Sequence, residues 1–180
     1  MSYFDTSTTI SPLDNPFWQF SLKVFKANQI QEICHSLQDK EGANVNLLLY
    51  CFWLAYEKEA VSEEAFNLAC QTIMPWHEQV TANLRKARRS IEISGEETGW
   101  LKDFFKRVLM DEILSESYQQ LLLYKASGKS KSVFNMDEEL AYRYLSWLFK
   151  SMGVALDEAR KKELQELITR VRNSLEEKVS

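Results

Sequence analysis

Hydrophobic positions along the chain recur at helical spacing, and one segment is apolar on almost every side. Residues 44–58 run Asn-Val-Asn-Leu-Leu-Leu-Tyr-Cys-Phe-Trp-Leu-Ala-Tyr-Glu-Lys, with polar side chains only near the two ends. A helix that is hydrophobic all round must be surrounded by other helices, and this one is too short for a bilayer, which takes about 20 apolar residues. The pattern predicts an all-α fold, a multi-helix bundle around a buried central helix at about residues 44–58.

Further helices are predicted on both sides of the central one. We expect Asp14 to cap the first, with Pro16 in its first turn, and Gly42 to end the second. A helix that starts at Ser62 is expected to end near Pro75, because proline interrupts helices. No stretch shows the period-two alternation of a strand. The expected helices besides the central one cover residues 14–25, 28–41, 62–75, 75–93, 100–124, 137–153 and 157–175.

The helix predicted after Pro75 has a regular apolar face. Its hydrophobic residues recur at steps of three or four, which places them on one side of the helix, and we expect that side to point inward. These residues are Trp76, Val80, Leu84, Ala87 and Ile91.

Composition shifts suggest four segments. Residues 1–13 are rich in Ser and Thr and are expected to form a flexible N-terminus, followed by a helical core at residues 14–126. Residues 127–136, with small and charged side chains, are expected to form a linker loop, and residues 137–180 a C-terminal helical hairpin packed on the core.

Composition and charge narrow the function classes. The chain is 45% hydrophobic and 27% charged, with five Gly and three Pro, which suits a globular helical protein. Its net charge is −4, so a general nucleic-acid binder is disfavoured. Cys34, Cys51 and Cys70 lie among apolar neighbours and are expected to be buried thiols in a reducing cytosol. No signal peptide or membrane anchor is expected, so we infer a cytoplasmic protein with no membrane partner.

Four short motifs occur in a fixed order along the chain. They are Asn15-Pro16-Phe17-Trp18-x-Phe20-Ser21-Leu22, Leu37-Gln38-Asp39, Asn44-Val45-Asn46-Leu47-Leu48-Leu49-x-x-x-Trp53-Leu54-Ala55, and Trp76 with Leu84-Arg85-x-x-Arg88-Arg89. Together they resemble an uncharacterised family of small all-helical proteobacterial proteins catalogued as a domain of unknown function. The resemblance covers roughly residues 15–125. It implies a bacterial, cytoplasmic, all-helical protein and supplies no catalytic residues.

Candidate catalytic chemistry is sparse. Glu32 and His35 have the Glu-x-x-His spacing of di-iron bundles, but such sites need a second copy, and the other histidine, His77, has no acid three residues before it. No glycine-rich phosphate loop and no Gly-x-Ser-x-Gly elbow is present. We therefore expect no metal, no cofactor and no catalytic residue.

The densest basic cluster combines Arg85, Arg88 and Arg89 on one helix face. One interpretation is a solvated face neutralised by nearby Glu92, Glu96 and Glu97. The other is a binding edge for an anionic partner, because arginine favours bidentate contact with carboxylates and phosphates. An acidic protein segment fits this better than RNA.

Asn46, Tyr50 and Trp53 form a polar-edged stripe on the central helix. Asn46 is expected either to bond a neighbouring loop, such as the one near Gln38-Asp39, or to line a small-ligand pocket with Tyr50 and Trp53. The sequence thus favours a cytoplasmic helical adaptor or regulatory protein, without catalysis, that binds a protein with an acidic surface. The alternative is a small-molecule-binding protein or enzyme that uses the Asn46 pocket.

Overall fold

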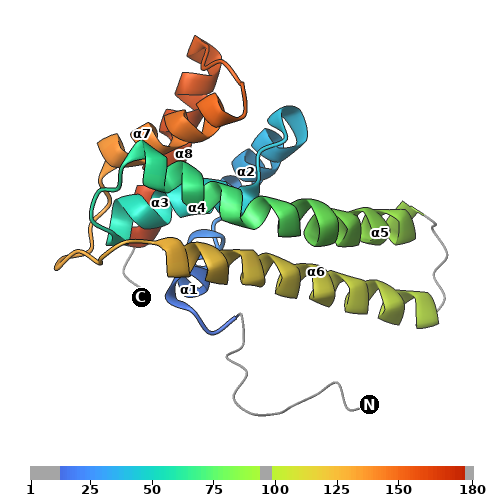
Figure 1. The fold of residues 1–180 in the computed structure, drawn as a ribbon. Coiled ribbons are helices and arrows are strands. Elements are labelled where there is room, and N and C mark those ends of the chain that lie inside the picture. Colours follow the sequence, from blue (N-terminus) through green and yellow to red (C-terminus); the bar gives the residue numbers. More distant parts are fainter. Residues whose placement is uncertain (1–12, 94–98, 177–180) are drawn as a thin grey trace.

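The computed structural model describes residues 13–93 and 99–176, and every regular element in those ranges is helical (Figure 1). The all-α prediction is confirmed. Of the predicted flexible segment 1–13, only Leu13 lies in the described ranges. The elements are α1 Pro16–Val24, α2 Asn28–Glu41, α3 Val45–Glu57, α4 Glu63–Trp76, the π-helical turn η1 His77–Thr81, α5 Ala82–Ile93, α6 Gly99–Ala126, α7 Glu138–Ser151 and α8 Glu158–Glu176.

Helix α3 is the centre of the bundle, as its all-round apolar sequence predicts. It contacts α1, α2, α6 and α7, and its side chains from Asn46 to Ala55 are buried. Aromatic rings surround it: the Trp53 ring centroid lies 5.5 Å from those of both Phe17 and Phe20 on α1. Burial of several large side chains at about 1.5–3 kcal/mol each makes this layer the main source of stability.

Local capping residues set the helix ends around α3. The Asn44 side chain accepts a hydrogen bond from Asn46 N at 2.9 Å, and Gly42 ends α2 with a φ of 72°, a conformation that favours glycine. The predicted cap of the first helix is wrong by one residue. Asn15, not Asp14, caps α1, because its side chain reaches Trp18 N at 2.9 Å.

Helix α4 ends at Trp76, close to the end predicted near Pro75, but helical geometry does not break there. Pro75 lies inside α4, and the chain continues through η1 into α5 as one long rod (Figure 1). The missing N–H of Pro75 leaves the carbonyl of Gln71, in the preceding turn, without its helical hydrogen bond, and the π turn η1 begins two residues after the proline, at His77. All three parts of the rod pack along α6, and this shared tertiary contact outweighs the local preference for a break.

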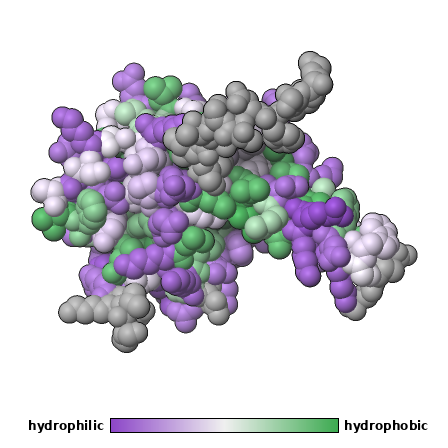
Figure 2. Space-filling model, turned by 90° about the horizontal axis from the view of Figure 1, so that it is seen from below, coloured by the Kyte–Doolittle hydropathy of each residue, from purple (hydrophilic) through white to green (hydrophobic). Residues whose placement is uncertain are grey.

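The outer half of this helix pair projects from the bundle as an arm (Figure 1). We define the arm as residues 76–93 of the rod together with residues 99–118 of the antiparallel α6. No residue of α5 is fully buried. Figure 2, which views the molecule from below, shows apolar side chains interleaved with polar ones where the arm leaves the bundle.

The C-terminal helices cover the other side of α3. Helix α7 packs on α3 and α4, and α8 packs on α1, α2 and α7. The connection at residues 127–136 runs alongside the C-terminal end of α3. There Lys131 N donates to Glu57 O at 2.8 Å, and Glu59 N donates to Lys129 O at 2.9 Å. No helix in the described ranges combines the length and the apolar character that a bilayer crossing requires.

Candidate functional site

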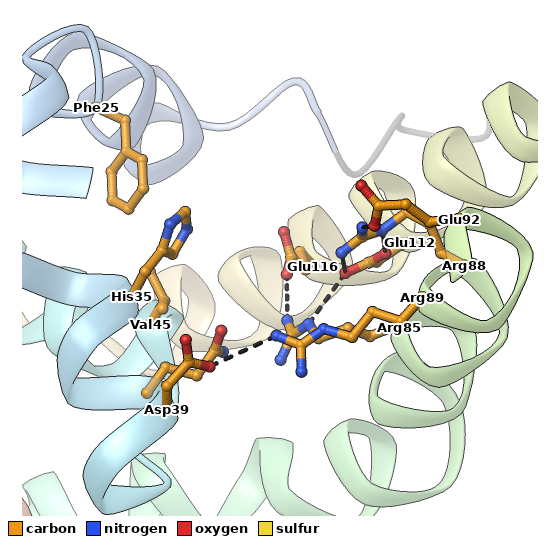
Figure 3. Close-up of a pocket in the computed structure, with 11 residues that line it drawn as sticks. Phe25, His35, Asp39, Val45, Arg85, Arg88, Arg89, Glu92, Glu112 and Glu116 are labelled. Atoms are coloured by element: carbon orange, nitrogen blue, oxygen red, sulfur yellow. Dashed lines mark hydrogen bonds and ion pairs between the residues drawn. The ribbon is translucent and has the colours of Figure 1, made fainter. Parts of the chain in front are cut away.

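The three arginines singled out from the sequence meet in one cavity of about 410 Å³ between α2 and the arm (Figure 3). Helix α2 contributes His35, Gln38 and Asp39 to its lining, and α6 contributes Glu112 and Glu116. Figure 3 shows the guanidinium groups of Arg85 and Arg88 pointing toward the carboxylates of α6, whereas that of Arg89 lies toward Asp39 on α2. The cavity therefore contains both signs of charge.

Glu112 is the central anion of this cluster. Its Oε1 accepts from Arg85 Nε at 3.0 Å and its Oε2 from Arg88 Nε at 2.5 Å, while its side chain is only 6% exposed. Arg85 Nη2 also donates to Glu116 Oε1 at 2.6 Å. Charge-assisted hydrogen bonds of this kind are about twice as strong as neutral ones. We call Arg85, Arg88, Glu112 and Glu116 the Arg–Glu brace, because it joins α5 to α6.

Two groups of the brace have shifted pKa values, with different causes. Desolvation raises the pKa of Glu116 above its ordinary value and outweighs the opposing effect of Arg85. The hydrogen bond to Glu112 raises the pKa of Arg88, which keeps its guanidinium charged. Two of the three arginines thus have strong partners inside the chain.

The structure corrects the expected orientation of α5. Arg85 and Arg88 face α6, whereas Ala87, expected to point inward, is exposed. Glu92 contributes only a longer pair, 3.6 Å from Arg88 Nη1, and Glu96 and Glu97 lie outside the described ranges. Arg89 alone of the three has a mostly exposed side chain, at 56%, and lies 3.5 Å from Asp39.

Sequence patterns alone do not identify Glu112 and Glu116 as members of this site. They lie four residues apart on α6 and so share a face, but 24 to 31 residues separate them from their arginine partners. The four-residue spacing places two carboxylates on one face of α6, but it indicates a contact with the arginines of α5 only when the antiparallel packing of α5 and α6 is known.

The opposite side of the arm is apolar and half-exposed. There the Trp76 ring packs against Tyr118 at 4.7 Å, and Trp100 packs against Phe104 at 6.5 Å. Trp100 and Phe104 are 65% and 41% exposed. We call this surface the apolar face of the arm; it comprises Trp76, Tyr118, Trp100 and Phe104.

A chain of buried amide and hydroxyl groups links the base of the arm to α3. Asn44 Nδ2 donates to Gln119 Oε1 at 3.1 Å, and Gln119 Nε2 donates to Thr81 Oγ1 at 2.7 Å. Thr81 pairs with Ser115 at 2.6 Å, and Trp76 Nε1 donates to Ser115 Oγ at 2.9 Å. Such fully paired networks fix one arrangement of the helices.

Tyr50 and Trp53 are not among the residues that line the recess beside Asn46. Asn46 Oδ1 accepts from Gln120 Nε2 at 2.8 Å rather than bonding the Gln38–Asp39 region, and it lines a shallow recess of about 130 Å³. Ligand pockets usually measure about 300–1,000 Å³. Tyr50 and Trp53 are 1% exposed and belong to the core.

Comparison with known families gives a match to the model described as "Protein of unknown function (DUF2390)", over residues 16–123. The chain belongs to this family. No curated protein and no solved structure matches the chain. The DUF2390 region runs from the start of α1 almost to the end of α6. It therefore contains α3, the Arg–Glu brace and the whole arm, while α7 and α8 lie beyond the matched range.

The cysteines of this DUF2390 chain are free and buried. Burial raises the pKa of both Cys34 and Cys70 to about 12 and that of Cys51 well above its ordinary value, so their thiols stay protonated near pH 7. A protonated thiol is a weak nucleophile and a poor metal ligand. Among the residues that the structure describes, no group of three or more His, Cys, Asp or Glu is placed to hold a metal ion.

Proposed function

We propose that this protein is a helical adaptor or regulatory protein of the bacterial cytoplasm that binds another protein through the apolar face of the arm and catalyses no reaction. The observation that carries the proposal is the exposure of aromatic rings on a projecting helix pair, with Trp100 at 65%. Aromatic side chains are enriched in protein interfaces, and clustered exposed ones mark interaction sites.

The Arg–Glu brace supports this role by holding the arm rigid. It joins α5 to α6 on the side opposite the apolar face, through contacts of 2.5–3.0 Å. The network at the base of the arm fixes the same helices against α3 through Gln119. A surface that is ordered before binding loses less conformational entropy on association, and this favours affinity.

The expected partner surface is an apolar helix with acidic residues at its edge. Arg107 lies beside the apolar face, with its guanidinium carbon 6.0 Å from the Phe104 ring centroid. A carboxylate on the partner would meet this cation at the rim. Arg85 and Arg88 contribute indirectly, since the Arg–Glu brace already engages them.

The proposal is tested with the double variant Trp100→Ser, Phe104→Ser and the matched control Leu68→Ser. Leu68 is 66% exposed on α4, outside the arm. A benzophenone photocrosslinker at position Glu78, on the exposed side of η1, reports binding in native cells. We expect discrete crosslinked protein in wild type and in the control, and loss of it in the double variant with unfolding unchanged.

Two outcomes contradict the proposal. One is crosslinking that persists in the folded double variant, which would exclude the apolar face as the interface. The other is a crosslinked partner that proves to be a second copy of this chain, which would replace the adaptor role by a homodimer.

A further inference from the structure

A second cavity, of about 420 Å³, lies between α4, the connection from α2 to α3 and the end of α7. Asn67, Gln71 and Met74 form the α4 wall, and His77 from η1 lies at one end. Leu148 and Met152 line the opposite wall. The cavity thus joins the DUF2390 region to the C-terminal helices, and its volume falls within the range of about 300–1,000 Å³ of known ligand pockets.

The lining of this cavity carries no Asp, Glu, Lys or Arg among the described residues. The arginine cavity, of nearly the same volume, is lined mainly by such groups. Burial, with a smaller effect of Arg85, lowers the pKa of His77 below its ordinary 6.5, so its imidazole is neutral at about pH 7. A charged ligand would lose its hydration here without finding a counter-charge, which is strongly unfavourable.

Polar groups in the lining are available for a ligand. The side-chain amides of Asn67 and Gln71 lie one helical turn apart, and neither makes a hydrogen bond within the described ranges. His77 Nδ1 is buried and makes no hydrogen bond of normal geometry, and its polar neighbour is the side chain of Gln119 on α6. Unpaired buried polar atoms are rare because each costs about 1–3 kcal/mol, and a ligand that pairs with one removes that penalty.

The apolar part of the lining is adaptable. Met74 and Met152 bring two thioethers to the cavity, and methionine adjusts to ligands of different shape because its side chain is flexible and polarisable. His77 is also the first residue of the π turn, and π turns within α-helices occur frequently at functional sites.

We propose that this cavity binds an uncharged, largely apolar small molecule with one or two hydrogen-bonding groups. Apolar contacts come from Leu148 and the two methionines. The amides of Asn67 and Gln71 contact the ligand's polar groups. The cavity is separate from the apolar face of the arm, so either binding proposal can be disproved without affecting the other.

The test uses two fluorescent probes that differ by one charged group. N-phenyl-1-naphthylamine is neutral, and 1-anilinonaphthalene-8-sulfonate carries a sulfonate on the same ring system. We expect one saturable site for the neutral probe and binding of the sulfonate weaker by at least roughly tenfold, equivalent to about 1.4 kcal/mol. Gln71→Trp and Ser151→Trp fill the cavity from exposed positions on α4 and α7. Each should lower the affinity for the neutral probe by a similar factor.

Leu68→Trp, an exposed α4 position outside the cavity lining, is the matched control and should leave binding unchanged. Absence of saturable binding overturns the proposal, as does binding that survives both filling variants. Equal affinity for the two probes overturns the assignment to uncharged ligands. Loss of binding in the Trp100→Ser, Phe104→Ser variant would move the probe site to the arm and also overturn the inference.

Discussion

Arg85 on α5 and Glu112 on α6 are joined by a hydrogen bond of 3.0 Å between Nε and Oε1, although 27 residues separate them in the sequence. Arg88 holds the other carboxylate oxygen, so one buried anion is bound by two cations from successive turns of the same helix. The basic residues that look like a docking surface in the sequence therefore act first as an internal contact that fixes the arm.

Arg85→Leu should lower the free energy of unfolding by about 1–3 kcal/mol, because buried Glu112 and half-buried Glu116 each lose a charged partner. Arg89→Leu is the matched control: the Arg89 side chain is 56% exposed, and the loss of stability should stay below about 1 kcal/mol. Urea unfolding measures both values. Equal small losses would show that the brace adds nothing to stability.

Leu48→Ala or Phe52→Ala should each destabilise the protein by about 2–5 kcal/mol, because each empties a fully buried site on α3. Leu68→Ala, at an exposed position on α4, should change stability by less than about 0.5 kcal/mol. Thermal and urea unfolding test this. A loss below about 0.5 kcal/mol at both α3 positions would contradict the central position of this helix.

Thr81→Val should cost about 1–3 kcal/mol, because it leaves Gln119 and Ser115 without the hydroxyl that joins them in the buried network. Thr72→Val provides the comparison within the same rod. The Thr72 hydroxyl bonds only the Leu68 carbonyl at an exposed site, so a much smaller effect is expected. Similar unfolding curves for the two variants would refute a stabilising role of the network.

His77 should make the protein lose stability as pH falls. Its folded-state pKa lies below the ordinary 6.5, so below about pH 6.5 the unfolded state binds the proton more readily and the free energy of unfolding decreases. His77→Gln should remove this part of the slope between about pH 7.5 and pH 5.5, whereas His35→Gln serves as a control for loss of a histidine. Parallel pH profiles for wild type and His77→Gln would contradict the shift.

Local sequence features were sufficient to predict much of the architecture. The apolar run of α3 required a surrounding bundle, and Gly42 and Ser62 marked helix ends because capping depends on a few neighbouring residues. These predictions succeeded because helical periodicity and capping are short-range effects.

The same short-range signals failed where distant segments compete with them. Pro75 reads as a helix end, but packing along α6 keeps the rod continuous. The apolar stripe that begins at Trp76 reads as a core-facing surface, yet α6 covers only one side of it and leaves Ala87 exposed. Periodicity shows which residues share a face; it does not show what that face meets.

The sequence by itself determined the fold class, the buried central helix and the types of residue available for binding. Only the tertiary structure decided which of them meet: Glu112 with Arg85 and Arg88, Asn46 with Gln120, and α4 with α7 around an uncharged cavity. The physical reason is the distance along the sequence over which the interactions act. A helix forms from contacts between residues up to four positions apart, whereas the partner of a buried charge and the walls of a cavity come from helices that pack together only in the folded chain.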